Sequence, residues 1–336
     1  MLLSSAEKNA VSKICDAIKR HRNFILTSHQ APDGDGLGCE LAFLRILRRL
    51  GKKTLVINEM IPSQVYNFLP GYSETLTVDS YREKKFIADA VMVFDCSSKD
   101  RIGKPLVFIP ESAFVINIDH HEGNTLFGNV NWVCRNRSSV GEMCYFIAKY
   151  LGFIDKKVSE CLYVSILTDT GSFRHNFNSD TINVVSELLK TGIDPENIAD
   201  NVYHNNSLQA LKLLGYALVS LQFDSALRVA WAVLPEQIFK QTGATEQDTE
   251  IVIDMLRSVE KTDFVFLAKE RRNEVKFSLR SRKHFNVRNI AEHFGGGGHN
   301  NAAGFSIKDC TLASAIEKLF RYLRQMNTGR NAWTGF

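Results

Sequence analysis

Acidic and imidazole side chains follow three apolar runs in the first half of the sequence. They are His29, Asp33 and Asp35 in SHQAPDGDGLGC, Asp95 in VFDCSS, and Asp119, His120 and His121 in IDHHEGN. Carboxylates gathered without a cation would repel one another or take up protons. A set of carboxylates and imidazoles without thiolates suits Mn, Mg or Fe better than a structural zinc site. With five or six such ligands, we expect two ions about 3.5 to 4 Å apart, joined by a shared Asp.

The apolar runs are the strands that would position these groups. They are FILTS (24–28), TLVIN (54–58), AVMVFD (90–95) and FVINID (114–119). Runs that are almost continuously apolar, with helical patterns between them, predict a parallel sheet covered on both faces. Open α/β sheets bind ligands at the carboxyl ends of their strands. Adjacent strand residues point to opposite faces, so His120 and His121 can share a site only if the chain turns there.

Two further features of the first half are local. Asp169 in TDTGSFR ends the helix expected in VSECLYVSILTD, where an Asp is either a simple helix-end residue or a further ligand. Ser4 with Glu7 predicts a capping box that opens an amphipathic helix. That N-terminal stretch has charges too early for a signal peptide.

Strand signals return after a mainly helical stretch. The runs are ALRVAWAVL (226–234), DFVFLAKE (263–270) and EVKFSLRS (274–281). Strands with helices between and after them predict a second, smaller α/β domain with a mixed sheet. We therefore expect a catalytic metal-binding domain over residues 1–192, a helical connector over 193–221 and a substrate-binding domain over 222–336.

The run FGGGGHNNAAGF is the strongest binding signal in the second half. Backbone N–H groups of Gly296, Gly297 and Gly298 can turn toward an anion, and His299 can reach the same anion. The small residues that follow favour close packing of a next helix. At the end of SLRS, the guanidinium of Arg280, beside Ser281, could grip a terminal phosphate with two hydrogen bonds. Arg174 in GSFR is a secondary candidate.

Composition limits the class of protein. The 336 residues are 44% hydrophobic and 23% charged, which is typical of a globular protein, and the net charge of +4 does not indicate a long footprint on duplex DNA. No run approaches the roughly 18 apolar residues of a transmembrane helix, so no membrane partner is expected. The seven cysteines contain no CxxC pair, which favours reduced thiols and a cytoplasmic location.

Five motifs in order make the sequence resemble the DHH phosphoesterase superfamily. They are SHQAPDGDGLGC, VFDCSS, IDHHEGN, TDTGSFR and GGGGHNNAAGF. The resemblance covers nearly the whole chain and is strongest to members described as nano-oligoribonucleases or 3'-phosphoadenosine 5'-phosphate (pAp) phosphatases. It implies a DHH domain followed by a DHH-associated C-terminal domain. One departure is Cys39, where many relatives carry Ser.

The resemblance also implies roles for single residues. One ion would be held by His29, Asp33 and Asp95, and the other by Asp35, Asp95, His120 and Asp169. Asp95 would bridge the two ions. His121 would contact the scissile phosphate or help the leaving oxygen take a proton, and Asp119 would orient an imidazole. Arg280 and the glycine run with His299 would hold the substrate.

The expected reaction is hydrolysis of a phosphoester by a hydroxide that two metal ions activate, with Mn²⁺ the first choice and Mg²⁺ or others open. The expected substrates are short single-stranded oligonucleotides or a nucleoside bisphosphate, and a homodimer is compatible with the sequence. An inorganic pyrophosphatase or exopolyphosphatase is the alternative, since Ser281, Arg282 and Lys283 form a triplet reminiscent of that branch. A non-catalytic nucleotide-binding regulatory module is the alternative of another class. It would show a lost ligand, whereas every expected position holds a competent residue.

Overall fold

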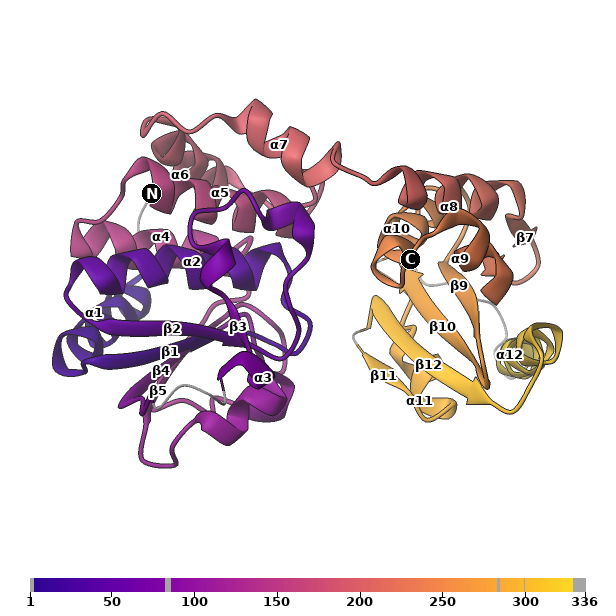
Figure 1. Ribbon diagram of the computed structural model, residues 1–336, viewed down its shortest axis with the longest axis horizontal. Coiled ribbons are helices and arrows are strands. Elements are labelled where there is room, and N and C mark those ends of the chain that lie inside the picture. The colour runs from indigo at the N-terminus through magenta and orange to yellow at the C-terminus, as the bar shows by residue number, and fades with distance from the viewer. Residues whose placement is uncertain (1–2, 82–85, 283–284, 299, 329–336) are drawn as a thin grey trace. The chain divides into compact units, whose positions relative to one another are not determined.

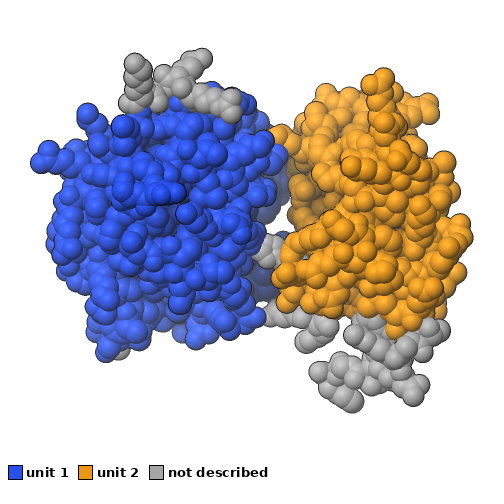
Figure 2. Space-filling model, turned by 90° about the horizontal axis from the view of Figure 1, so that it is seen from below, with its two compact units in different colours: residues 1–205 blue, residues 206–336 orange. Residues whose placement is uncertain are grey.

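The computed structural model describes residues 3–81, 86–282, 285–298 and 300–328 (Figure 1). The chain forms two compact units, residues 1–205 and 206–336 (Figure 2). The stretch expected to be a connector is divided between them, because α7 (Pro195–Tyr203) belongs to the first unit and α8 (Leu208–Val219) to the second. The functional division into domains stays a prediction.

The first unit contains the expected parallel sheet. Its six strands lie in the order β3-β2-β1-β4-β5-β6, and every neighbouring pair is parallel. The strands are β1 (Asn23–Thr27), β2 (Lys53–Asn58), β3 (Leu76–Thr77), β4 (Ala90–Phe94), β5 (Phe114–Asp119) and β6 (Val130–Val133). Because all strands run the same way, the ends of β1, β4 and β5 meet at one edge of the sheet.

Helices cover one face of this sheet more deeply than the other (Figure 1). The helices of the unit besides α7 are α1 (Ser5–Arg20), α2 (Gly34–Arg49), α3 (Val78–Tyr81), α4 (Val140–Leu151), α5 (Lys156–Asp169) and α6 (Ser179–Leu189). Strand residues alternate between two cores: Phe24 and Leu26 pack with α1, α2, α4, α5 and α6, while Ile25 packs with the segment around α3. The capping box of Ser4 and Glu7 opens α1, as predicted.

The second unit contains a mixed sheet, as expected. Its order is β11-β12-β10-β9-β8-β7; β8 and β9 are parallel, and the other pairs are antiparallel. The strands are β7 (Gln222–Asp224), β8 (Val229–Leu234), β9 (Phe264–Arg271), β10 (Glu274–Ser281), β11 (Gly297–Gly298) and β12 (Ala302–Lys308). The helices besides α8 are α9 (Glu236–Thr242), α10 (Glu250–Leu256), α11 (Arg288–His293) and α12 (Leu312–Thr328).

One expectation about the second unit is wrong. The residues after the glycine run form β12 and not a helix. Ala303 and Phe305 alternate into the core, and all seven residues of the strand pair with β10. Cross-strand packing therefore decides the structure of a segment whose small residues carry little intrinsic preference for a strand. Within the described residues, no helix is long and apolar enough to cross a membrane.

Candidate metal centre

Asp33 is fixed by the helix that it starts. As the N-cap of α2, its Oδ1 accepts hydrogen bonds from the N–H groups of Asp35 (3.0 Å) and Gly36 (3.2 Å). Its other oxygen, Oδ2, lies 3.6 Å from Nε2 of His29. Because α2 begins at Gly34, Asp35 belongs to the first turn of the helix.

Glycines in this motif bring α2 against α5. A Cβ atom at Gly34 would lie 2.4 Å from Oγ1 of Thr168, and one at Gly38 would lie 2.4 Å from the carbonyl oxygen of Cys161. Neither position has room for a side chain. Since Thr168 immediately precedes Asp169, this close packing helps bring the end of α5 to the start of α2.

Asp35 is buried and held by the first turn of α4. Its Oδ2 accepts from the N–H of Val140 (2.9 Å), and its Oδ1 accepts from the N–H of Gly141 (3.1 Å) and from the hydroxyl of Ser165. Burial raises the pKa of this carboxyl well above its usual range, and the nearby carboxylate of Asp95 raises it further. Hydrogen bonds and the helix terminus therefore fix the position of a carboxyl group whose burial favours the protonated form.

Asp95 lies at the centre of the site, directly after β4. Its φ of 51° is in the left-handed region, which few residues other than glycine adopt. Its Oδ2 lies 3.4 Å from Nε2 of His29, and its Oδ1 lies 3.6 Å from Nε2 of His120 and 3.3 Å from Nδ1 of His121. Within the described residues, the buried Oδ1 has no hydrogen-bond partner. An unusual backbone conformation thus directs a carboxylate among three imidazoles, with its unsatisfied oxygen beside His120 and His121.

His120 points into the same cluster from the end of β5. Its Nε2 lies 3.7 Å from Oδ2 of Asp35, 3.6 Å from Oδ1 of Asp95 and 3.6 Å from Oδ2 of Asp169. Its Nδ1 pairs with the carbonyl oxygen of Arg137 at 3.2 Å. Because a carbonyl can only accept, Nδ1 carries the proton and Nε2 faces the acids.

The chain turns after Asp119, so the next two imidazoles approach the same cluster. Nδ1 of His121 lies 2.8 Å from Oδ1 of Asp119, which is completely buried. The other oxygen of Asp119 accepts from Nδ2 of Asn124 at 2.7 Å. The carboxylate of Asp119 thus holds the ring of His121 by a hydrogen bond, and its orienting role stays a prediction. No sequence pattern indicated Asn124.

The cluster has the composition and spacing of a metal site. Three sets of side chains could each hold a cation: His29, Asp33 and Asp95; Asp35, His120 and Asp169; and Asp95, His120 and His121. Most of the nitrogen–oxygen separations above exceed those of ordinary hydrogen bonds. At 3.3 to 3.7 Å, they are at or slightly above the roughly 3.0 to 3.4 Å that separates two ligand atoms lying about 2.1 Å from one cation. The residues present therefore fit divalent metal.

Protons bound to the imidazoles and to a carboxyl group can balance the charge of this cluster. Burial raises the pKa of Asp169 to about 7. Burial lowers the pKa of His29, but Asp33 and Asp95 outweigh it and raise that pKa to about 10. Burial likewise lowers the pKa of His120, but the nearby acids, Asp169 first, raise it to about 9. Imidazolium and carboxylate groups thus neutralise one another where a metal ion would otherwise do so.

The expected substrate residues of the second unit lie on β10 and β11. Nη2 of Arg280 pairs with Oε2 of Glu250 at 3.2 Å. Ser281 is buried, and its hydroxyl donates to the carbonyl oxygen of Phe285, so it faces the core on the opposite side of the strand from Arg280. Gly297 and Gly298 pair with β12.

The remaining candidates for substrate binding are Gly296, His299 and Arg174. Gly296 packs tightly, because a Cβ there would lie 2.2 Å from the carbonyl oxygen of Gly304. His299 and Lys283 lie outside the described residues. Arg174, in the first unit, is exposed, and its Nε donates to the carbonyl oxygen of Gly171 at 2.6 Å.

Comparison with known proteins agrees with this geometry. The model of the DHH family N-terminal domain matches residues 23–166, and that of the DHHA1 domain matches residues 228–327. The curated bifunctional oligoribonuclease and PAP phosphatase NrnA of Thermus thermophilus is 30% identical over 305 residues, which are 89% of each chain. This chain belongs to the DHH family.

Other DHH proteins are similar over comparable lengths. The NrnA protein of Bacillus subtilis is 25% identical over 91% of this chain and 96% of its own. The crystal structure of an exopolyphosphatase-related protein from Bacteroides fragilis superposes with a TM-score of 0.88 at 27% identity, covering 95% of this chain and 98% of that one. The fold and the order of the two DHH-type domains therefore agree.

Proposed function

We propose that this DHH protein hydrolyses short single-stranded oligonucleotides (nanoRNA), pAp or both, using two divalent ions, with Mn²⁺ the first choice. The observation that carries the proposal is the central position of Asp95 among His29, His120 and His121. The chain is a phosphoric ester hydrolase by its family and its relatives. The names of the NrnA relatives support the substrates proposed.

The proposed ligands divide into two sets that share Asp95. One ion would be held by His29, Asp33 and Asp95, and the other by Asp35, Asp95, His120 and Asp169. When bound, such ions neutralise phosphate oxygens and lower the pKa of water. The chain contributes orientation: the amides of α2 and α4 fix Asp33 and Asp35, and the carbonyl of Arg137 fixes the ring of His120.

His121 is proposed to act on the substrate. The carboxylate of Asp119 holds a proton on its Nδ1, so the proton exchanged with the leaving oxygen would be the one on Nε2. Asp119 would also stabilise the imidazolium form, because its oxygens are fixed by His121 and Asn124. Both residues therefore have proposed catalytic roles.

The second unit is proposed to recognise the rest of the substrate. Arg280 would bind a terminal phosphate, beside the backbone of Gly296, Gly297 and Gly298 and the ring of His299. Ser281 would hold the strand end through its hydroxyl, and Arg174 of the first unit would be a further phosphate contact. The groups of the second unit would set the length of substrate that is accepted.

Location and assembly are also proposals. The seven cysteines are free thiols and five are buried, which supports a reducing, cytoplasmic compartment. A homodimer is proposed as the assembly to test by measuring the mass in solution. Neither proposal affects the chemistry above.

The deciding experiment is Mn²⁺-dependent hydrolysis by the pure protein. The substrates are pAp, 5'-labelled di- to pentanucleotides, a linear dinucleotide and pyrophosphate, each tested with His120→Ala and Asp119→Ala. His204→Ala is the matched control, because that imidazole is exposed and pairs only with Asp200 among the contacts described. Release of mononucleotides, lost in His120→Ala and kept in His204→Ala, is the expected result.

Two other outcomes would change the assignment. Fast cleavage of pyrophosphate alone would favour the pyrophosphatase or exopolyphosphatase alternative. The Bacteroides fragilis relative is named as an exopolyphosphatase-related protein. Nucleotide binding without turnover of any substrate would favour the non-catalytic regulatory module.

A further inference from the structure

We propose that Arg137 is a positioning residue, whose buried guanidinium fixes the segment that orients the metal ligands His120 and Asp35. The inference rests on the metal site of the proposed function and adds a residue from outside it. Arg137 has no contact with the proposed ligands through its side chain among the interactions described, so it would act through the backbone of its own segment.

The segment in question runs from the end of β6 to the start of α4, residues 134–141. Its Arg137 carbonyl accepts from Nδ1 of His120 at 3.2 Å. Three and four residues on, the N–H groups of Val140 and Gly141 donate to the two oxygens of Asp35. One short segment therefore orients two of the proposed ligands, which come from different elements.

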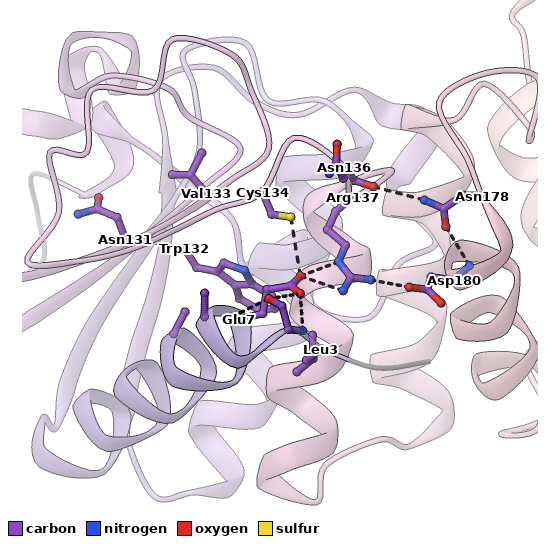
Figure 3. Close-up of a pocket in the computed structure, with 13 residues that line it drawn as sticks. Leu3, Glu7, Asn131, Trp132, Val133, Cys134, Asn136, Arg137, Asn178 and Asp180 are labelled. Carbon is purple, nitrogen blue, oxygen red and sulfur yellow. Dashed lines mark hydrogen bonds and ion pairs between the residues drawn. The ribbon is translucent and has the colours of Figure 1, made fainter.

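Acids from three helices surround the guanidinium of Arg137, and Figure 3 shows two of them, Glu7 and Asp180. Its Nε and Nη2 lie 2.9 and 2.8 Å from Oε1 of Glu7 on α1. Its Nη1 lies 2.7 Å from Oε1 of Glu142 on α4 and 3.6 Å from Oδ2 of Asp180 on α6. The ring of Phe146 lies 4.9 Å from its central carbon. The side chain is only 7% exposed, so these contacts are shielded from water.

Glu142 extends this arrangement into the backbone of the segment. It is fully buried, and its Oε2 accepts from the N–H of Ser138 (2.9 Å), the hydroxyl of Ser138 (2.7 Å) and the hydroxyl of Thr181 (3.0 Å). Every donor but Arg137 is neutral, so the guanidinium supplies the only opposite charge among these contacts. Removing it would leave a buried carboxylate without a counter-charge and would loosen Ser138, next to the carbonyl that orients His120.

The chemistry requires arginine and not merely a positive charge. Arg137 uses Nε, Nη1 and Nη2 at once, to acids on three helices, in the planar geometry of a guanidinium. A lysine ammonium is a single point on a flexible stem and cannot hold all three acids in place. Ser139 and Glu142 have the spacing of a capping box, but the carboxylate of Glu142 binds Ser138 instead of the cap.

A cavity beside the guanidinium makes substitution feasible. It has a volume of about 680 Å³, and Glu7, Arg137, Asn178 and Asp180 are among the residues that line it (Figure 3). A smaller or differently shaped side chain at position 137 would therefore not overpack the protein. Arg137→Lys and Arg137→Gln are suitable tests for this reason.

The test measures Mn²⁺ binding to the full chain by calorimetry, beside the free energy of unfolding. Both variants are expected to bind Mn²⁺ about 10- to 100-fold more weakly, the effect usual for residues that orient ligands. Arg135→Gln is the matched control, because Arg135 lies in the same segment and forms an exposed pair with Glu122. Val184→Ala, at a core position of α6, supplies a variant that is destabilised while Arg137 and the acids around it are unchanged.

A second readout separates this inference from the proposed function. In metal-free protein, the Nδ1–H proton of His120 should exchange slowly in the wild type and quickly in Arg137→Gln. If the wild type binds no Mn²⁺ but this difference is seen, the metal site fails and the positioning role stands. If Arg137→Gln binds Mn²⁺ as Val184→Ala does and keeps the slow proton, the role of Arg137 is only structural and the inference is overturned.

Discussion

The charged sites of the two units are built in different ways. In the first unit Asp35 and Asp95 are buried, backbone amides fix Asp33 and Asp35, and one oxygen of Asp95 has no hydrogen-bond partner among the described residues. In the second unit, the cationic side chains of β9 and β10 pair with carboxylates of their own unit. Glu246 contacts Lys269 (2.6 Å), Lys276 (3.2 Å) and Arg271, and Glu250 contacts Arg280.

The difference indicates what each site needs. In the proposed metal site, ligand atoms are already oriented toward common points, and a cation would complete it. In the second site, the ion pairs described join two carboxylates to four cations, and an anionic substrate would take over part of the role of Glu250 at Arg280. We therefore expect the first site to be preorganised and the second to exchange partners on binding.

Replacing the shared acid should have the largest effect. Asp95→Asn removes charge from both proposed ligand sets, and activity should fall on the order of 10³-fold or more. Initial rates at saturating Mn²⁺ and substrate measure the change. Asp100→Asn, an exposed acid a few residues on, is the control and should be unchanged. Near-normal activity of Asp95→Asn would show that the site does not depend on a bridging carboxylate.

Burial of the carboxyl group of Glu40 should lower the free energy of unfolding measurably as the pH rises. This residue is fully buried and accepts from Asn58 at 2.8 Å; burial raises its pKa from near 4.5 to about 7, despite that hydrogen bond. Between these values the folded state keeps a proton that the unfolded chain has lost, so the free energy of unfolding falls as pH rises. The full penalty above pH 7 is about 3 kcal/mol.

Glu40→Gln should remove this pH dependence. Urea unfolding at several pH values from 4.5 to 8 should show the variant gaining stability over the wild type as pH rises. Glu111→Gln, at an exposed acid, is the control. A constant difference between Glu40→Gln and the wild type across this range would mean that Glu40 titrates normally.

Removing the proposed phosphate ligand should affect binding more than chemistry. Arg280→Gln should raise KM about 10- to 50-fold for short oligonucleotides and change kcat by less than about threefold, since its contact is equally strong before and during reaction. Steady-state kinetics measure both. Arg288→Gln is the control, because Arg288 is exposed and pairs with Glu292. A fall in kcat alone would place Arg280 at the reacting phosphate instead.

Releasing the same arginine from its internal partner should have the smallest effect, in the opposite direction. Glu250→Gln removes the acid at 3.2 Å from Arg280, so KM should fall about two- to fivefold. Glu260→Gln, at an exposed residue, should leave KM unchanged. An increase in KM for Glu250→Gln would mean that Glu250 holds Arg280 in its binding position and does not compete with the substrate.

Much of the proposed metal centre could be predicted from the sequence, because the ends of strands can be recognised there. Apolar runs ending in Asp95 and Asp119 predicted that these acids meet at one sheet edge, and the family resemblance added Asp169. Because side chains alternate along a strand, Arg280 and Ser281 lie on opposite faces. The prediction that both residues bind the substrate did not use this alternation.

The remainder depends on contacts between distant parts of the chain. The pairing of Arg137 with Glu7 joins residues 130 positions apart, and the amides that hold Asp35 come from α4. Gly34 and Gly38 serve the packing of α2 against α5. Such roles follow from tertiary neighbours, which no local pattern encodes.

The most direct test of the account is to count and locate metal ions in crystals grown with Mn²⁺, using anomalous scattering. The account predicts two ions per chain, one among His29, Asp33 and Asp95 and the other among Asp35, Asp95, His120 and Asp169. A single ion, or ions held elsewhere while the purified protein remains active, would contradict it.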